Sequence, residues 1–129
     1  MPFGRRPEAE PRGARGRRGE EIACRHLEAR GFSLLARNFR CRGGELDVVA
    51  REGGVTVFVE VKERADATRG TGLEAVTPSK RRRIVHAARI YAAAHGLGEA
   101  PLRFDVISID WQGGRPVVRH EIGAFDADA

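Results

Sequence analysis

The sequence has little cysteine, few aromatic residues and no long apolar run. Cys24 and Cys41 are its two cysteines in 129 residues, which fits a reducing compartment and argues against a disulfide framework or a cysteine zinc site. Aromatic residues make up 6% of the chain and form no stacking array for single-stranded nucleic acid. No apolar run approaches the roughly 20 residues of a membrane span, and the amino terminus lacks a signal-peptide core. We therefore expect a cytoplasmic protein without a membrane partner.

Charge is what the sequence has in abundance. Lys and Arg number 23 against 18 Asp and Glu, so the formal net charge is +5. A basic domain of this size favours polyanions, either nucleic acid or an anionic membrane surface. Since 41% of the residues are hydrophobic, the chain can bury a core. We expect a flexible basic arm over residues 1–15, one domain over 16–125 and a tail over 126–129.

The hydrophobic pattern predicts an α/β fold of the order α-β-β-β-α-β-β, a single sheet with helices packed on it. The second helix has a clear start, because Thr77 is a good N-cap and Pro78 suits the first helical position. A turn is expected over residues 111–114. The predicted helices span residues 16–30 and 77–95, and the predicted strands span 32–40, 45–51, 55–63, 102–110 and 116–122.

The most informative segment is a predicted β-hairpin around Gly53-Gly54. A two-residue primed turn there fixes the register and places Asp47 directly opposite Glu60, with Lys62 on the same face as Glu60. Opposed like charges destabilise a sheet unless a cation neutralises them, and Mg²⁺ or Mn²⁺ prefers carboxylate oxygens. The alternative is a solvated face with ordinary ion pairs. We favour a metal site, because the neighbouring strand is too apolar for a surface ribbon.

Such a site has a definite chemistry. A divalent ion can orient and acidify a water molecule and can offset charge that develops on a phosphodiester. Lys62 would orient that water or stabilise the transition-state charge. No histidine spacing and no Ser or Cys nucleophile motif competes with this set of residues.

Two further carboxylates are expected to be buried. Glu20 lies beside the apolar stripe of the first helix, where a carboxylate is costly without a partner. Asp105 alternates onto the face of Ile107 and Ile109, and we expect it to form a structural ion pair with a nearby arginine.

Basic residues crowd the first turn of the second helix, where cations oppose the helix macrodipole. A nucleic-acid phosphate is their natural partner, and two arginines in the preceding loop are further phosphate candidates. The alternative is that these side chains extend into solvent, which we expect for at least two of the four helix residues. The helix residues are Lys80, Arg81, Arg82 and Arg83, and the loop residues are Arg64 and Arg69.

Six motifs together resemble the bacterial YraN family, in order and spacing, from about Gly16 to Phe125. That family is similar to the archaeal Holliday-junction resolvases of the PD-(D/E)xK nuclease superfamily. The resemblance implies a restriction-endonuclease-like core, metal-dependent phosphodiester cleavage and often a homodimer. The motifs are Gly16-Arg17-Arg18-Gly19-Glu20, Asn38-Phe39-Arg40, Gly44-Glu45-Leu46-Asp47, Val57-Phe58-Val59-Glu60-Val61-Lys62, Thr77-Pro78-Ser79-Lys80 and Arg103-Phe104-Asp105.

Carried over by position, the resemblance implies roles for four residues. Asp47 and Glu60 would be the metal carboxylates, Lys62 the catalytic lysine, and Glu20 the helix glutamate that joins the metal site. The sequence thus predicts a Mg²⁺- or Mn²⁺-dependent nuclease acting on DNA, on branched or otherwise structured duplexes. Two alternatives stay open: a non-catalytic nucleic-acid-binding module that retains the nuclease fold, and a subunit active only within a larger assembly.

Overall fold

The computed structural model of the chain describes residues 14–64 and 76–128. Within these ranges, two helices and five strands follow one another in the predicted order. Residues 1–13 of the expected basic arm and the loop that carries Arg69 lie outside the described residues. Neither of the two described helices is long and apolar enough to cross a membrane. The elements are α1 (Ala14–Ala29), β1 (Ser33–Cys41), β2 (Gly44–Glu52), β3 (Val55–Arg64), α2 (Pro78–Ala94), β4 (Leu102–Gln112) and β5 (Arg115–Phe125).

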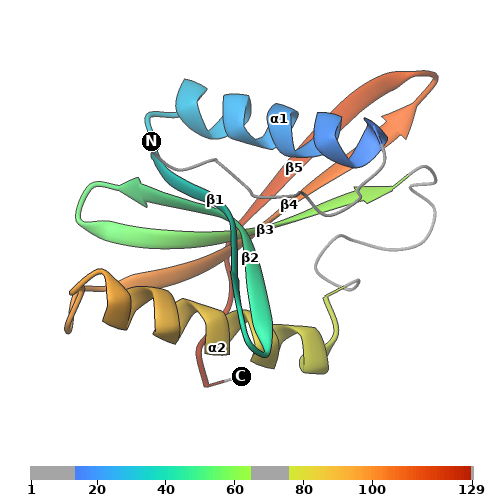
Figure 1. Cartoon of the computed structure of the whole chain (residues 1–129). Coiled ribbons are helices and arrows are strands. Elements are labelled where there is room, and N and C mark those ends of the chain that lie inside the picture. Colours follow the sequence, from blue (N-terminus) through green and yellow to red (C-terminus); the bar gives the residue numbers. More distant parts are fainter. Residues whose placement is uncertain (1–13, 65–75, 129) are drawn as a thin grey trace.

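The described strands form one mixed sheet in the order β1-β2-β3-β4-β5. β3 and β4 run parallel, and the other neighbouring strands run antiparallel. A parallel pair needs a crossover connection, and α2 lies in it. α1 covers one face of the sheet and α2 the other (Figure 1). The predicted α/β fold, a mixed sheet flanked by helices, is confirmed.

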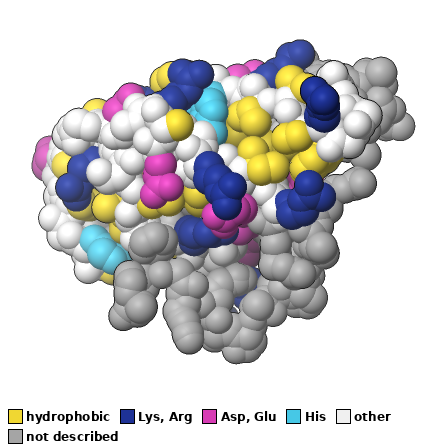
Figure 2. Space-filling model, turned by 90° about the horizontal axis from the view of Figure 1, so that it is seen from above, with side chains coloured by type: hydrophobic (Ala, Val, Ile, Leu, Met, Phe, Trp, Pro, Cys, Tyr) yellow, Lys and Arg dark blue, Asp and Glu magenta, His cyan; other side chains and the backbone are white. Residues whose placement is uncertain are grey.

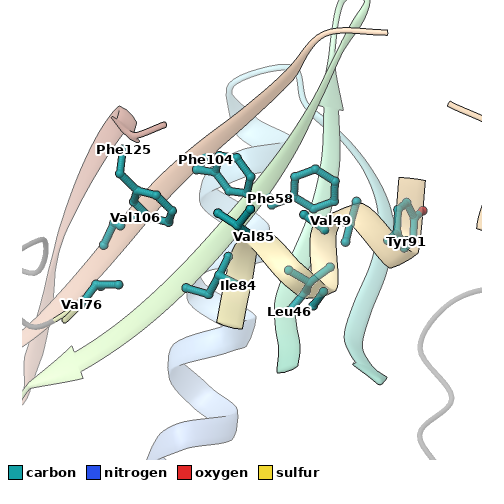
Figure 3. Packing of buried hydrophobic residues seen from close by; sticks show 12 residues of the cluster. Leu46, Val49, Phe58, Val76, Ile84, Val85, Tyr91, Phe104, Val106 and Phe125 are labelled. Atoms are coloured by element: carbon teal, nitrogen blue, oxygen red, sulfur yellow. The ribbon is translucent and has the colours of Figure 1, made fainter. Parts of the chain in front are cut away.

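Each helix covers its own apolar cluster. Under α2, the ring of Phe58 lies 5.6 Å from that of Phe104 and 5.9 Å from that of Tyr91 (Figure 3). Under α1, Leu27 packs in a cluster with Val57. Since Phe58 and Val57 are neighbours in β3, their opposite directions confirm the predicted alternation. β3 is therefore buried on both faces, and its charged residues lie near its carboxyl end.

The start of α2 is the one predicted. The Thr77 hydroxyl accepts a hydrogen bond from the Lys80 N–H at 3.2 Å, and Pro78 occupies the first turn. The tip of the β1–β2 hairpin reaches this helix (Figure 1). A Cβ at Gly44 would overlap the carbonyl oxygen of Arg83, so hairpin and helix meet main chain to main chain. This contact fixes the first turns of α2 beside β2.

The turn predicted over residues 111–114 is shorter in the structure. β4 continues to Gln112, which pairs with Arg115 at the start of β5. Gly113 and Gly114 alone make the turn, with φ angles of 59° and 81°, and such left-handed glycines let both flanking residues remain paired. Trp111 therefore lies in the strand, and β5 also extends past the predicted end at residue 122.

Candidate functional site

β2 and β3 diverge at one end of their pairing. The two strands pair from Glu52 opposite Val55 to Val48 opposite Val59, which confirms the register predicted from the Gly-Gly turn. Beyond that point β2 remains paired with β1, and β3 remains paired with β4. Each strand thus follows its outer neighbour, and the sheet opens between them.

Asp47 lies where the strands part. The β2–β3 pairing stops one residue short of Asp47 and Glu60, so the predicted direct opposition does not extend this far. Instead, Asp47 Oδ2 accepts a hydrogen bond from the main-chain N–H of Val61 at 2.9 Å. A short carboxylate can replace a main-chain acceptor in this way. The bond fixes Asp47 beside the residue that separates Glu60 from Lys62.

A cavity of about 230 Å³ opens at this divergence. Asp47 is 6% and Glu60 5% exposed, and both lysines of the sequence, Lys62 and Lys80, line the same space. The rest of the 23 basic residues are arginines. Lysine presents a compact point charge, unlike the planar guanidinium of arginine. The cations of this cavity therefore differ in chemistry from the other basic residues of the chain. We call this space the carboxylate cavity, lined by Glu45, Asp47, Glu60, Val61, Lys62, Glu63 and Lys80.

An ion pair neutralises one of the buried acids. Lys80 Nζ lies 3.1 Å from Glu60 Oε2, and the two side chains are 35% and 5% exposed. A buried carboxylate is costly without a cation, and Lys80 supplies one from α2. Sequence reasoning assigned Lys80 to phosphate and missed this pairing. No local pattern in the sequence signals it, because Lys80 and Glu60 lie on different elements.

Glu20 is buried, 3% exposed, on α1. Asn38 Nδ2 donates to Glu20 Oε1 at 3.3 Å, and Arg37 Nη2 lies 3.8 Å from the same oxygen. Asn38 has a φ of 55°. Its neighbours Arg37 and Phe39 pair with Val48 and Leu46, the residues on either side of Asp47. Glu20 is absent from the lining of the carboxylate cavity, and across residues 14–64 and 76–128 no three His, Cys, Asp or Glu side chains are grouped to hold a metal ion. Glu20 as a third ligand stays a prediction.

The carboxylate cavity nevertheless fits a hydrated Mg²⁺ or Mn²⁺. These ions take one or two carboxylates and complete their shell with water and phosphate oxygens. Asp47 and Glu60 are hard oxygen donors from two strands, both buried and both facing one space. They are the residues that could hold the ion, and Lys80 is the cation that now lies against Glu60.

Of the residues predicted to bind phosphate, some bind groups of the protein itself and others are exposed to solvent. Arg64 forms a two-bond ion pair with buried Asp110, with Nε–Oδ1 at 2.9 Å. Arg81 Nε donates to the Val76 carbonyl at 3.0 Å. On the face that carries α1, basic side chains are interspersed with acidic and apolar ones (Figure 2). Of the other residues, Arg82 and Arg83 are exposed, Lys80 is half-buried, and Arg69 lies outside the described residues.

A second cavity of about 560 Å³ adjoins the first, and the two share Glu45 and Lys80. Its floor includes main chain of the β1–β2 turn, where Gly43 and Gly44 carry no side chain. Arg83, one turn after Lys80, supplies a second cation. We call it the glycine cavity, lined by Cys41, Gly43, Gly44, Glu45, Lys80, Arg83 and Ile84.

Asp105 has a separate, structural environment. It is fully buried and accepts hydrogen bonds from Arg103 Nε (2.8 Å), His120 Nε2 (2.8 Å) and the Gly123 N–H (3.0 Å). Burial alone would raise the pKa of Asp105, but the bonds from His120 and Arg103 outweigh it and lower the pKa to about 2. His120 in turn lies 3.2 Å from His26, whose pKa is lowered by burial and by that neighbour. The predicted arginine pair is confirmed, and the histidines were not foreseen.

Comparison with known proteins identifies the family. The model of the uncharacterised protein family UPF0102 matches residues 19–109. The chain belongs to this family. A UPF0102 protein of Anaeromyxobacter dehalogenans (strain 2CP-C) is 47% identical over 117 residues, which cover 91% of this chain and 87% of the relative. One from Myxococcus xanthus (strain DK1622) is 49% identical over 112 residues, 87% and 89% of the two chains. The region matched by UPF0102 contains all the described residues of the carboxylate cavity, and it confirms the family resemblance seen in the motifs.

Proposed function

We propose that this UPF0102 chain binds nucleic acid and hydrolyses phosphodiesters with a divalent metal ion, acting on branched or structured DNA. The observation that carries the proposal is the carboxylate cavity, where two buried acids and both lysines of the chain converge. A structural ion-pair network has no need of a cavity, whereas a metal, a water and a phosphate do. The resemblance to the resolvases supports the same reaction.

In this proposal each residue of the carboxylate cavity has a separate role. A bound Mg²⁺ or Mn²⁺ polarises the phosphodiester and acidifies a water molecule. Asp47, held by the Val61 N–H, and Glu60 keep their oxygens oriented before any substrate arrives, so little reorganisation is needed. Lys62 follows Glu60 on the same face of β3, where its ammonium group orients the water or stabilises negative charge on phosphate.

The experiment compares cleavage of four-way junction, flap, linear duplex and single-stranded DNA with Mg²⁺ or Mn²⁺. We expect Asp47→Asn and Lys62→Met each to lower the cleavage rate by about a hundredfold or more, since each removes a group acting in the transition state. Binding of DNA should survive in both variants. Denaturing gel electrophoresis measures the cleavage rate, and fluorescence anisotropy measures binding.

Matched controls remove the same charges elsewhere. Asp126→Asn and Arg115→Met alter exposed residues near the carboxyl end and at the β4–β5 turn, and both should cleave at the parental rate. If the unaltered protein leaves all four DNA forms uncut with either metal, the nuclease proposal must be abandoned.

A second function, non-catalytic nucleic-acid binding, is favoured by one observation. Lys80 already neutralises Glu60, and the described residues present no group of three metal-binding side chains. Salt-sensitive DNA binding without measurable affinity for Mn²⁺ would select this alternative. Cleavage only after a stoichiometric partner is added would instead select a subunit of a larger assembly.

A homodimer forms part of the first proposal, because symmetric cleavage of a junction needs two active sites. Light scattering of the protein with and without junction DNA measures the number of copies bound.

A further inference from the structure

Lys80 lies between the two cavities and lines both. Its ammonium group contacts Glu60 in the carboxylate cavity, while Arg83, one helical turn later, lines the glycine cavity. The Lys80 side chain is 35% exposed, whereas that of Glu60 is 5% exposed. The acid is therefore fixed in the sheet, and the lysine is the partner with freedom to move.

The glycine cavity has features that suit a phosphate group. Its floor is the β1–β2 turn, and Gly44 cannot carry a side chain without displacing Arg83, so main chain approaches closely there. Lys80 and Arg83 supply two cations, and the acid on its wall, Glu45, has a partner of its own in Arg40, with Nε–Oε1 at 3.8 Å. A cavity of 560 Å³ is within the size range that holds small ligands.

In this arrangement Lys80 and a divalent ion would compete for the carboxylate of Glu60. A divalent ion at Glu60 would displace the ammonium group, because Lys80 Nζ lies 3.1 Å from Glu60 Oε2 and the two cations repel each other at that range. A displaced Lys80 in the first turn of α2 faces the positive end of the helix macrodipole and needs an anion. A phosphate in the glycine cavity is within reach of the residue that already lines it.

We propose that Lys80 exchanges partners: it holds Glu60 when no metal is bound and turns to a nucleic-acid phosphate in the glycine cavity when a divalent ion takes its place. This inference rests on the proposed function, because it assumes a metal at the carboxylate cavity. Metal and nucleic acid then favour the same position of Lys80, so each raises the affinity for the other, and by thermodynamic linkage the two effects are equal.

The first experiment measures Mn²⁺ affinity by calorimetry without nucleic acid. Lys80→Met removes the competing charge and should bind Mn²⁺ roughly tenfold more tightly than the parent. Arg89→Met removes the same charge from an exposed residue further along α2 and should leave the affinity unchanged. An Mn²⁺ affinity of Lys80→Met equal to or weaker than that of the parent overturns the exchange.

The second experiment measures coupling, with Ca²⁺ used because it takes the same oxygen ligands. In the parent and in Arg89→Met, Ca²⁺ should tighten binding of a fluorescent DNA junction by roughly fivefold or more. In Lys80→Met this dependence should disappear. A coupling that persists undiminished in Lys80→Met contradicts the proposal.

A third measurement uses the unaltered chain, in case Lys80→Met fails to fold. The sequence contains two lysines, so acetylation followed by peptide mass spectrometry reports on Lys80 without crowding from other lysines. Labelling of Lys80 should be slow without metal, several-fold faster with Mg²⁺, and slow again when DNA is added. Labelling that does not respond to Mg²⁺ while Mn²⁺ binds by calorimetry overturns the exchange.

The outcomes separate this inference from the nuclease proposal. Cleavage with an unchanged Mn²⁺ affinity in Lys80→Met retains the nuclease and removes the exchange. Tighter Mn²⁺ binding by Lys80→Met, with no cleavage by any variant, retains the exchange and removes the nuclease. Absence of Mn²⁺ binding by both proteins overturns both.

Discussion

Asp105 and Glu60 are both buried acids, but their surroundings give them different uses. Asp105 is held by Arg103, His120 and the Gly123 N–H from its own strand and the neighbouring one. Asp105 lines neither the carboxylate cavity nor the glycine cavity. Glu60 faces a cavity and contacts a lysine from a distant helix. A carboxylate with several fixed donors stabilises a fold, whereas one with a single exchangeable cation can accept a metal.

Asp105 should make the stability of the protein depend on pH at the acid end. Its pKa is lowered from 3.8 to about 2, so the unfolded chain binds the proton more readily. The contribution is on the order of 2 kcal/mol, is fully present above about pH 4, and is lost as the pH falls through 2. Urea unfolding followed by circular dichroism between pH 6 and pH 2 measures it.

Asp105→Asn should lower the free energy of unfolding at pH 7 by about 3 to 5 kcal/mol, because it replaces a buried carboxylate that accepts hydrogen bonds from Arg103, His120 and the Gly123 N–H. It should also flatten the pH dependence below pH 4. Asp126→Asn, at an exposed position, is the control and should keep the parental curve. Equal acid sensitivity of Asp105→Asn and the parent would show that other carboxylates dominate.

At the scale of the elements, the contact between the β1–β2 hairpin and α2 determines where Lys80 lies. Gly44 touches the carbonyl of Arg83, and the ring of His86 lies over Gly43, with Nε2 3.0 Å from the Arg42 carbonyl. Three successive hairpin residues thus meet two turns of the helix. A shift of either element would move Lys80 away from Glu60.

Gly44→Ala tests this contact. The added methyl group would overlap the Arg83 carbonyl, so main chain must move, and we expect a loss of about 1 to 3 kcal/mol of unfolding free energy. Gly54→Ala is the matched control, since a Cβ there meets nothing within 4 Å and should be tolerated. Urea unfolding measures both variants, and equal stability would show that the hairpin can move away without cost.

At the scale of the whole molecule, the net charge of +5 is spread over a surface where many cations already have acidic partners. Arg64 pairs with Asp110 and Arg103 with Glu52 and Asp105. Net charge therefore says less about nucleic-acid binding than the position of the remaining cations. We expect the edge formed by the start of α2 and the β1–β2 turn to be the binding surface.

The salt dependence of DNA binding tests this expectation. Each lost phosphate contact reduces the slope of log K against log salt by about 0.9. Arg83→Met should reduce the slope by about this amount, whereas Arg115→Met, at the exposed β4–β5 turn, should leave it unchanged. Anisotropy titrations between 50 and 200 mM salt give the slopes, an interval over which such contacts respond strongly. An equal reduction in both variants would indicate diffuse binding.

Local rules in the sequence predicted the parts of the molecule that local interactions determine. The Gly53-Gly54 turn fixed the hairpin register, and Thr77 with Pro78 fixed the start of α2. The same rule applied to Gly113-Gly114 would have kept Gln112 in its strand. The pattern of residue types also brought Asp47, Glu60 and Lys62 to one cavity, as predicted.

Contacts between distant segments were beyond local rules. Where β2 diverges from β3, Asp47 accepts a hydrogen bond from the Val61 N–H, which no pattern encodes. The Lys80–Glu60 pair depends on how α2 crosses the sheet, and the His120 bond to Asp105 depends on the register of β5. Each joins segments whose spacing is set only by the completed fold.

The Gly123–Asp105 bond also affects how the sheet ends. β5 is an edge strand, and an unprotected edge invites a strand from another copy to add to it. Gly123 has a φ of 62° beside a register shift in the β4–β5 pairing, and Pro116 near the other end lacks an N–H donor. Regular edge-on addition is thereby confined to the stretch between these two residues. A second copy that added a strand here could therefore pair along only part of β5.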